Sequence, residues 1–245
     1  MGGAMGIGGA CVRAFAAQGW AVAILDRDAG VANTLATELS ATTEACSLCV
    51  DITSQQALAD AITAIRERFP ERRIHAAVNS AGKFDERDAV FKTSLAAFRS
   101  LLDVNVIGAF LFSQAVEPLM DDGASLIHIG SVNGLHSGGG LGAYKTTKAA
   151  LHMLARCMAR ELAHDPRKIR VNVVAPGWVD TPGERRMLAS HGREADLDNP
   201  ETAKWIPLGR RTYASEIANT VMFLCSDAAS ATTGQILFVD GGMSA

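Results

Sequence analysis

The sequence predicts one doubly wound α/β domain built around a parallel sheet. Short runs of β-forming residues alternate with helical stretches along the whole chain, and 48% of its 245 residues are hydrophobic. That length suits one large domain with a sizeable core, and no repeat, linker or change of composition divides it. Strands joined through helices require right-handed crossovers, so the sheet should be parallel and covered on both faces. We therefore expect residues 1–245 to form a single domain.

Six runs rich in β-branched and other apolar residues are the expected strands. They cover residues 20–26, 45–51, 74–79, 125–130, 169–174 and 235–240. Helices are expected between them, because apolar residues there recur three and four positions apart. Two such series are Leu58, Ile62, Ile65 and Phe69, and Leu151, Leu154, Met158 and Leu162. In this fold class ligands bind at the carboxyl ends of the strands, so functional residues are expected where the β-rich runs end.

The charge balance excludes several classes of partner. The chain has 23 Lys and Arg against 26 Asp and Glu, and its basic runs are no longer than pairs such as Arg72-Arg73. We therefore expect no nucleic-acid partner.

No stretch approaches ~18 consecutive apolar residues, and the first residues lack a basic start followed by an apolar block. The sequence thus predicts a cytoplasmic protein with no membrane partner.

Five cysteines at irregular spacings suit free thiols in a reducing compartment. Cys46 and Cys49 are spaced C-x-x-C and can be interpreted as a redox or zinc pair. However, they lie in an expected strand, where positions three apart face opposite ways, and no second C-x-x-C completes a metal site. Two buried structural cysteines are therefore favoured. The six His residues show no metal-ligand spacing, so no metal is expected.

A glycine cluster at the start of the chain is the first candidate for ligand binding. Residues 2–8 contain four glycines and precede a helical stretch, so backbone N–H groups and a helix N-terminus can approach a pyrophosphate. Asp26 ends the next expected strand, where a carboxylate would accept the adenosine ribose hydroxyls and repel a 2′-phosphate. Arg27 follows it and would favour that phosphate. The cofactor preference depends on which side chain faces the ribose, and the strand-end carboxylate favours NAD over NADP.

Tyr144 and Lys148 are the candidates for acid–base chemistry. Positions four apart on a helix share a face, so both side chains can point into one cleft. An ammonium beside a phenol stabilises the phenolate and lowers the phenol pKa from its usual ~10. A phenol with a lowered pKa can act as general acid or base. The alternative is a surface tyrosine beside a solvated lysine.

Several other polar residues lie where β-rich runs end. Ser131 follows the run that ends at residue 130, and Asn105 lies in a helical stretch. Further ends carry the segments Asn79-Ser80-Ala81-Gly82 and Pro176-Gly177-Trp178-Val179-Asp180-Thr181. Together with Tyr144 and Lys148, these segments resemble the short-chain dehydrogenase/reductase family in order and spacing, from Gly2 to the C-terminus. The resemblance includes its glycine loop from the first glycine onward, Asp51-Ile52-Thr53, and Val239 to Gly242 as V-D-G-G.

The resemblance implies a Rossmann-type fold and an oxidoreductase that interconverts a secondary alcohol and a ketone with NAD(H). Tyr144 would exchange a proton with the substrate oxygen, and Ser131 would hydrogen-bond that oxygen. Lys148 would lower the pKa of Tyr144 and hold the nicotinamide ribose, and Asn105 would keep a water in line with Lys148 as a proton relay. The implied cofactor contacts are Gly2, Gly6 and Ile7 at the pyrophosphate, Asp26 at the adenosine ribose, Asp51 and Ile52 at the adenine, Asn79, Ala81 and Gly82 along the middle, and Pro176, Gly177, Val179 and Thr181 at the nicotinamide end.

Two departures from the family pattern stand out. Ser80 replaces the second Asn of an N-N-A-G segment, which removes one side-chain amide. In the family an apolar strand ending in Thr precedes the glycine loop, but here Met1 stands at the place of that Thr, so about 6–10 residues of a central strand are absent. The gap must be closed, filled by a borrowed strand, or left as a weakened loop. We expect a reading frame that begins upstream; the alternative is a catalytically weakened dinucleotide-binding or structural member of the family.

Residues 182–211 are charged and irregular, and the resemblance implies that they form the substrate lid. The alternative is a solvated surface insertion. Arg185, Arg186, His191 and Trp205 are the candidates to meet a polar or sugar-like substrate. The family resemblance also implies a homo-oligomer, with a tetramer as the expected state. The substrate is expected to be a small-molecule alcohol or ketone, which spacing alone does not identify.

Overall fold

Six parallel strands form the centre of the protein in a computed structural model of residues 1–245, which describes all but residues 85–88, 138–139, 191, 193–200 and 202–203. Each strand overlaps one of the six β-rich runs of the sequence. They are β1 (Val22–Asp26), β2 (Ala45–Cys49), β3 (Ile74–Asn79), β4 (Met120–Ile129), β5 (Arg170–Pro176) and β8 (Ile236–Val239). The two-residue strands β6 (Val179–Asp180) and β7 (Thr212–Tyr213) pair apart from them. The α/β class and the parallel sheet are thus confirmed.

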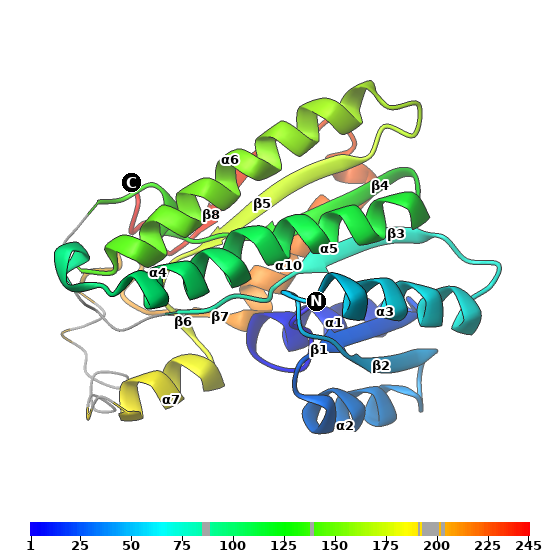
Figure 1. Ribbon diagram of the computed structural model, residues 1–245, viewed down its shortest axis with the longest axis horizontal. Helices are drawn as coiled ribbons and strands as arrows, with labels where there is room; N and C mark the ends of the chain where they lie inside the picture. Colours follow the sequence, from blue (N-terminus) through cyan, green and yellow to red (C-terminus); the bar gives the residue numbers. More distant parts are fainter. Residues whose placement is uncertain (85–88, 138–139, 191, 193–200, 202–203) are drawn as a thin grey trace.

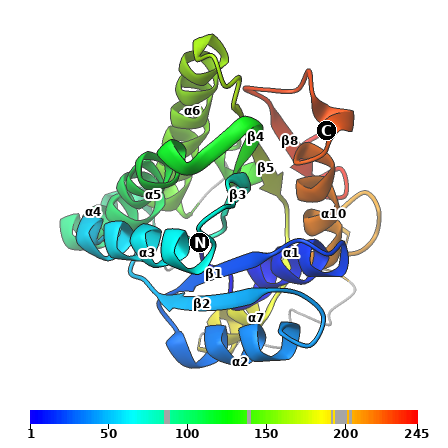
Figure 2. The ribbon, with the colours of Figure 1, turned by 90° about the vertical axis from the view of Figure 1, so that its right-hand side faces the viewer.

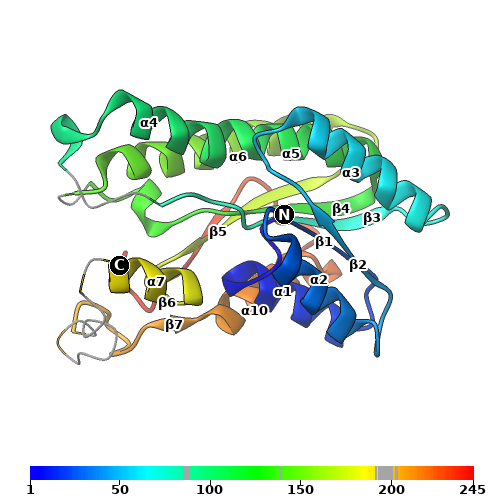
Figure 3. The same ribbon diagram turned by 60° about the horizontal axis from the view of Figure 1, so that its bottom comes forward.

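Helices cover both faces of the strands, as Figures 1 and 3 show. One face carries α1 (Gly6–Ala17), α2 (Ala29–Leu39) and α10 (Ala214–Leu224). The other carries α3 (Gln55–Arg68), α4 (Leu95–Leu102), α5 (Gly108–Val116) and α6 (Gly142–His164). Helix α7 (Pro182–Ser190) lies outside these layers, near the short pair β6 and β7 (Figure 1).

The strands do not form one continuous sheet. β3, β4, β5 and β8 make a four-stranded sheet in the order β3-β4-β5-β8, whereas β1 pairs only with β2. Figure 2 shows the N-terminus at the boundary between β1 and β3. There the Met1 ammonium donates to Val78 O (2.7 Å), Ser80 N donates to Met1 O (2.9 Å), and Gly2 N donates to Leu25 O (2.8 Å). In the described residues the sheet is therefore divided between β1 and β3.

Two buried apolar clusters stabilise the layers. One joins α1, α2 and α10 to the sheet and includes Phe15, Ile24 and Ile217. The other lies beneath α3, α5 and α6 and includes Leu126 and Val171. Fully burying a side chain of this size contributes about 1.5–3 kcal/mol, so these faces supply the main driving force for the fold.

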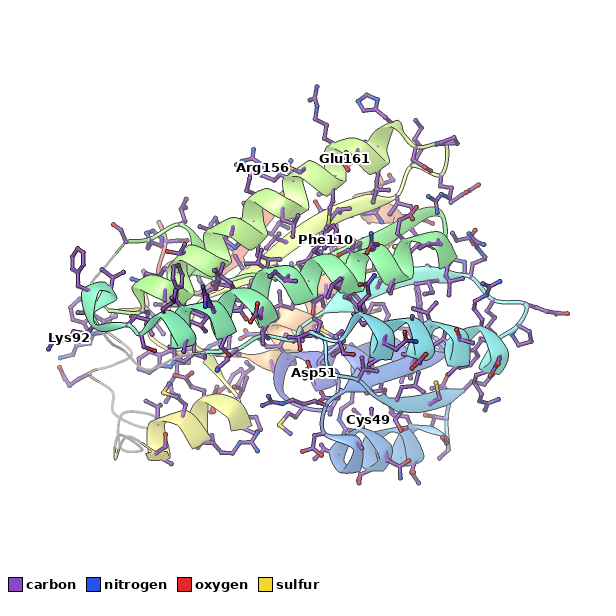
Figure 4. The ribbon with its side chains drawn as sticks, in the orientation of Figure 1. Cys49, Asp51, Lys92, Phe110, Arg156 and Glu161 are labelled. Atoms are coloured by element: carbon purple, nitrogen blue, oxygen red, sulfur yellow. The ribbon has the colours of Figure 1, made fainter. Side chains whose placement is uncertain are left out.

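Two sequence expectations are wrong in detail. β4 begins at Met120 rather than at residue 125, because exposed residues such as Asp122 continue the extended backbone ahead of the buried run. The ladder to β3 is irregular there, and its pairing jumps from Ile74 opposite Met120 to Ala76 opposite Ser125. Cys49 is exposed and Cys46 half-buried, so burial of both is also wrong. Figure 4 shows Cys49 near the end of β2, where strand positions three apart face opposite ways.

The segments α4, Asp103–Ile107 and α5 continue into one long helix, Leu95–Leu119. By length and composition it is the one described helix that is long and apolar enough to cross a membrane. Helices that cover the core of a globular domain pass the same test. The buried residues of its second half include Phe112 and Val116, which belong to the apolar cluster beneath α3, α5 and α6.

Candidate active site

Four elements bring the expected catalytic residues together at the carboxyl end of the four-stranded sheet. Ser131 follows β4 and caps the 3-10 turn Val132–Gly134, where its Oγ accepts a hydrogen bond from Asn133 N (3.1 Å). Tyr144 lies in the first turn of α6, and Lys148 lies one turn later. The Ser131 side chain lies close enough to Tyr144 to act on its pKa, which it lowers. The Lys148 Nζ lies 5.7 Å from the centroid of the Tyr144 ring.

Helix α6 begins in an unusual backbone conformation. Leu141, which precedes it, has φ of 61°, in the left-handed region that costs a non-glycine residue roughly 1–2 kcal/mol. Leu141 is buried, so packing holds this conformation. The position of Leu141 therefore sets where the first turn of α6, with Tyr144, begins.

Asn105 lies in the π-helical turn Asp103–Ile107 and is buried. Its side chain makes three hydrogen bonds: Oδ1 accepts from Lys83 N (2.7 Å), and Nδ2 donates to Lys83 O (2.9 Å) and to Thr147 Oγ1 (3.0 Å). Asn105 thus fastens the segment after β3 to helix α6. Gly82 lies beside it, and a Cβ on Gly82 would stand 3.5 Å from both Asn105 Oδ1 and Lys148 Nζ. The structure therefore brings Asn105, Gly82 and Lys148 together.

The electrostatics of Tyr144 differ from the sequence prediction. Burial raises the pKa of Tyr144 to about 12, opposed by the Ser131 side chain and reinforced by the negative charge of Glu184. Burial lowers the pKa of Lys148 to about 8. The lowered phenol pKa predicted from the Tyr144 and Lys148 spacing is thus wrong for the protein without bound cofactor. Desolvation dominates, and the ammonium donates to Ile129 O (3.0 Å).

The glycine segment approaches other backbone very closely. Gly2 and Gly6 have φ of 68° and 59°, which favour glycine. A Cβ on Gly2 would stand 2.5 Å from Ala81 N, and one on Gly8 would stand 1.9 Å from Gly2 O. Side chains are therefore excluded here, and the segment is packed against the end of β3. Ile7 is half-buried against the apolar cluster of α1, α2 and α10.

The Asp26 side chain contacts this glycine segment. Asp26 Oδ2 accepts from Ala4 N (2.9 Å), and its Oδ1 accepts from Asp28 N (3.0 Å). Arg27 is exposed, and its charge acts on Asp51, whose pKa is lowered mainly by hydrogen bonds from Thr53. Figure 4 shows Asp51 just past the end of β2. Asp26 thus accepts backbone hydrogen bonds at the glycine segment, and the charge of Arg27 acts on Asp51.

Most of the remaining residues that were expected to bind the cofactor have buried side chains. Asn79 is buried, and its Oδ1 accepts from Ala81 N (3.1 Å). Ile52 is also buried and packs against Gly108, so only its backbone is available to an adenine ring. Thr181 lies opposite the glycine segment, because a Cβ on Gly6 would stand 3.7 Å from Thr181 Cβ. Pro176 and Val179 are buried, and Gly177 packs against Asp240.

The lid candidates do not gather around Tyr144. Arg185 pairs with Asp180 (2.5 Å), and Arg186 Nη2 reaches Met5 Sδ (2.8 Å) at the glycine segment. Trp205 is 80% exposed. His191 lies outside the described residues. The expectation that these four residues contact the substrate stays a prediction.

Other side chains that the sequence did not single out lie close to Tyr144. The ring of Phe84 packs edge-on against Tyr144, with centroids 4.8 Å apart. The charge of Glu184 acts on Tyr144, and Glu184 Oε1 accepts from Trp178 Nε1 (2.8 Å). His152 is buried behind Ser131 and accepts its backbone N–H at Nε2 (3.4 Å). His152 lies eight positions after Tyr144 on α6, a helical spacing that is a weak signal for this contact.

The residues present fit a dinucleotide cofactor. No side chain caps the N-terminus of α1, and its first turn has no acidic residue, so its N–H groups are open to an anion such as a pyrophosphate. The positive φ angles of Gly2 and Gly6 leave no side chain in the way. Lys148 uses one described hydrogen bond of the three that an ammonium can donate. Among the described residues, no group of three His, Cys, Asp or Glu could hold a metal ion.

Known proteins are similar to this chain over nearly its whole length. A family profile described as Enoyl-(Acyl carrier protein) reductase matches residues 2–244. Galactitol 2-dehydrogenase (L-tagatose-forming) from Cereibacter sphaeroides is 36% identical over 97% of this chain and 90% of its own length. The 3-oxoacyl-[acyl-carrier-protein] reductase of Mus musculus is 32% identical over 99% of this chain and 95% of its own length.

Solved structures are similar over the full chain. A short-chain dehydrogenase/reductase from Serratia marcescens superimposes with a TM-score of 0.88 at 33% identity, covering 100% of this chain and 96% of its own. A 7α-hydroxysteroid dehydrogenase complexed with NADH and a 7-oxo bile acid has a TM-score of 0.86 at 32% identity, over 99% and 91% of the two chains. A blue fluorescent protein from a metagenomic library, complexed with NADPH, has a TM-score of 0.87 at 30% identity, over 100% and 96%. Both NADH and NADPH complexes therefore occur among similar structures.

Proposed function

Because the chain belongs to the short-chain dehydrogenase/reductase family of oxidoreductases, we propose that it interconverts a secondary alcohol and a ketone with NAD(H). One observation carries this proposal: the Ser131 side chain lies close enough to Tyr144 to lower its pKa, and the Lys148 Nζ lies 5.7 Å from the centroid of the Tyr144 ring. Two hydroxyls that converge in this way can bind one substrate oxygen between them. The nicotinamide cofactor, when bound, supplies or accepts the hydride.

The side chains of the site have different roles toward the substrate oxygen. Ser131 orients that oxygen, and Tyr144 donates a proton to it during ketone reduction or accepts one during alcohol oxidation. The raised pKa of Tyr144, about 12, keeps the phenol protonated in the free protein. Lys148 would hold the nicotinamide ribose, and Asn105 would position the water of a proton relay.

The orientation of Asp26 supports NAD as the cofactor. Its carboxylate lies at the end of β1 beside Ala4 N, where it would accept ribose hydroxyls and repel a 2′-phosphate. Two of the roughly four acceptor positions of a carboxylate are occupied by Ala4 N and Asp28 N, which leaves acceptor capacity for the ribose. Arg27 is exposed and close enough to Asp51 to influence it, so it is the weaker determinant. NADP remains the less favoured cofactor.

We propose that residues 1–245 act as one domain on a small-molecule alcohol or ketone, with residues 182–211 as the lid. Trp178, Glu184 and Phe84 lie near Tyr144 and are the candidates for substrate contact. We also propose that the protein is cytoplasmic and has no nucleic-acid or membrane partner. By family resemblance it forms a homo-oligomer, with a tetramer as the expected state. Exposed apolar residues on the long helices, such as Phe110 on α5 (45% exposed) and Met153 on α6 (58% exposed), support self-association. Figure 4 shows Phe110 on α5 below Arg156 and Glu161 on α6.

One observation favours a second candidate, a dinucleotide-binding or structural member with weakened catalysis. The sheet is divided between β1 and β3, next to the glycine segment that would hold the pyrophosphate. The four catalytic candidates lie on the undivided side, and they favour the enzyme.

The test is NADH formation with a panel of secondary alcohols, repeated for Tyr144→Phe and for Tyr213→Phe. Tyr213 is the other tyrosine of the chain, and its side chain is exposed at 57%, so it is the matched control. Tyr144→Phe should lower kcat by about 10²- to 10⁴-fold with NAD binding retained, because it removes the proton donor. Turnover unchanged in Tyr144→Phe would remove Tyr144 from the mechanism. NAD binding without turnover in the unmodified protein would favour the second candidate.

A further inference from the structure

His152 lies directly behind Ser131 and has no role in the proton transfer described above. Its side chain is 5% exposed and projects from α6 two turns after Tyr144. Its Nε2 accepts the backbone N–H of Ser131 (3.4 Å). The preceding residue, Gly130, still donates to Val174 O on β5 (2.7 Å). The chain therefore leaves the sheet at Ser131, where the imidazole replaces a strand as the acceptor for a buried backbone donor.

Two glycines on either side of Ser131 make room for the imidazole. A Cβ on Gly130 would stand 2.4 Å from His152 Nε2, and one on Gly134 would stand 2.4 Å from His152 Cε1 and 2.6 Å from its Nδ1. Neither glycine has a positive φ, so space rather than backbone conformation explains why they are glycines. The three atoms nearest to a Cβ on Gly134 all belong to the imidazole. The segment from Gly130 to Gly134 is therefore shaped around His152.

Helix α6 holds this segment at two successive points. Lys148 Nζ donates to Ile129 O (3.0 Å), and one turn later His152 Nε2 accepts from Ser131 N. Tyr144, Lys148 and His152 follow one another at intervals of four residues, so their side chains leave the same side of the helix. The position of Ser131 relative to Tyr144 therefore depends on one rigid element, which carries Tyr144 and grips the loop of Ser131.

The protonation state of His152 suits this contact. A ring nitrogen accepts a hydrogen bond only when it carries no proton, so the proton of the neutral ring lies on Nδ1. Burial, reinforced by the positive charge of Lys148, lowers the pKa of His152 to about 4 from 6.5. The ring is therefore neutral near pH 7, and its Nε2 is available to Ser131 N.

We propose that His152 is a positioning residue, which holds Ser131 by its backbone N–H so that the Ser131 hydroxyl can orient the substrate oxygen. This inference rests on the proposed function, in which Ser131 orients that oxygen for proton transfer by Tyr144. His152 touches neither substrate nor cofactor in this role, and it acts through Ser131. Misplacing an orienting group by about 1 Å can cost on the order of 10²-fold in rate. The contribution of His152 must therefore vanish when the Ser131 hydroxyl is removed.

The first test is amide hydrogen exchange at Ser131, which needs neither cofactor nor turnover. His152→Leu fills much of the space of the ring without an acceptor, and it should speed exchange of the Ser131 N–H by about three- to tenfold. His152→Gln should restore protection, because its amide oxygen reaches about as far as Nε2 and can accept. The control is Met158→Ala, since Met158 also lies on α6 but packs against the apolar cluster beneath α3, α5 and α6. It should leave Ser131 exchange unchanged.

The second test is a double-mutant cycle of kcat for NADH formation from an alcohol. His152→Leu should lower kcat by about tenfold with NAD affinity unchanged in calorimetric titration, and His152→Gln should recover most of this loss. In a Ser131→Ala background, His152→Leu should change kcat by less than about twofold, because the hydroxyl that it positions is absent. A general loss of packing would instead lower kcat equally in both backgrounds.

The proposal is overturned if Ser131 exchange is the same in the unmodified protein and in His152→Leu. It is also overturned if His152→Leu lowers kcat equally with and without the Ser131 hydroxyl, or if His152→Gln behaves as His152→Leu does. If circular dichroism shows that His152→Leu does not fold, Gly134→Ala replaces it, because its methyl group displaces the ring and should speed Ser131 exchange in the same way. No turnover in the unmodified protein would count against the proposed function, and Ser131 exchange would still decide whether His152 holds that residue.

Discussion

The two parts of the sheet are built from similar strands but supported differently. β4 is paired with β3 on one side and β5 on the other, whereas β1 is paired with β2 alone and its second edge borders a cavity of about 710 Å³ between β1 and β3. Ser131, Tyr144, Lys148 and Asn105 depend on the four-stranded part. Asp26 and Arg27 lie at the end of β1, in the two-stranded part. The candidate proton-transfer residues thus lie at the end of the four-stranded part, and the proposed contact with the adenosine ribose lies at the end of β1 in the two-stranded part.

Truncating one leucine in each part gives the largest expected contrast. Leu126→Ala in β4 should lower the free energy of unfolding by about 2–5 kcal/mol, because the residue is buried between two paired strands. Leu25→Ala in β1 should cost about 2 kcal/mol or less, because Leu25 lines the existing cavity. Urea unfolding monitored by circular dichroism measures both. Equal losses would show that the cavity is not open in solution.

Acid should weaken the four-stranded part through His128. Burial lowers the pKa of His128 to about 4 from 6.5, so between these values the unfolded chain binds a proton that the folded chain does not. Stability is therefore present above pH 6.5 and falls as the pH drops toward 4, by up to about 3 kcal/mol from this residue. His152, with its pKa also lowered to about 4, adds in the same direction.

Urea unfolding at pH 4.5 and 6.5 checks this effect. His128→Asn should reduce the difference between the two pH values, and His136→Gln, at an exposed position, should leave it unchanged. A difference that is the same in all three proteins would mean that His128 is already protonated in the fold or does not titrate differently on unfolding.

The smallest expected effect concerns the cofactor end of β1. Asp26→Asn should weaken NAD binding by about ten- to hundredfold, since a hydrogen bond to a charged acceptor is worth about 1.5–3 kcal/mol. It should also reduce the ratio of NAD affinity to NADP affinity, because the carboxylate that repels the 2′-phosphate is removed. Arg27→Ala should change NAD affinity by less than about fivefold, because its side chain is exposed. Calorimetric titration with NAD and NADP measures both. A larger NAD loss in Arg27→Ala would reverse the roles of the two residues.

The sequence predicted the strands best where a buried apolar run has clear ends. The strand Ile74–Asn79 has the bounds that its composition predicts. β4 was predicted too short because Asp121 and Asp122 are polar, yet they continue the strand at an exposed edge where burial exerts no preference. The π-helical turn at Asn105 was not predicted, since it differs from an α-helix by a single hydrogen-bond step that has no pattern in the sequence.

The family and the parallel α/β architecture follow from the sequence, because they depend on periodicity and motif spacing along the chain. Tertiary structure alone decided that the Asp26 carboxylate accepts from Ala4 N, that desolvation raises the pKa of Tyr144, and that Phe84 and Glu184 lie near Tyr144 while His152 lies behind Ser131. It also decided that a cavity lies between β1 and β3. Burial and contact between distant segments determine these properties, and neither quantity is local in sequence.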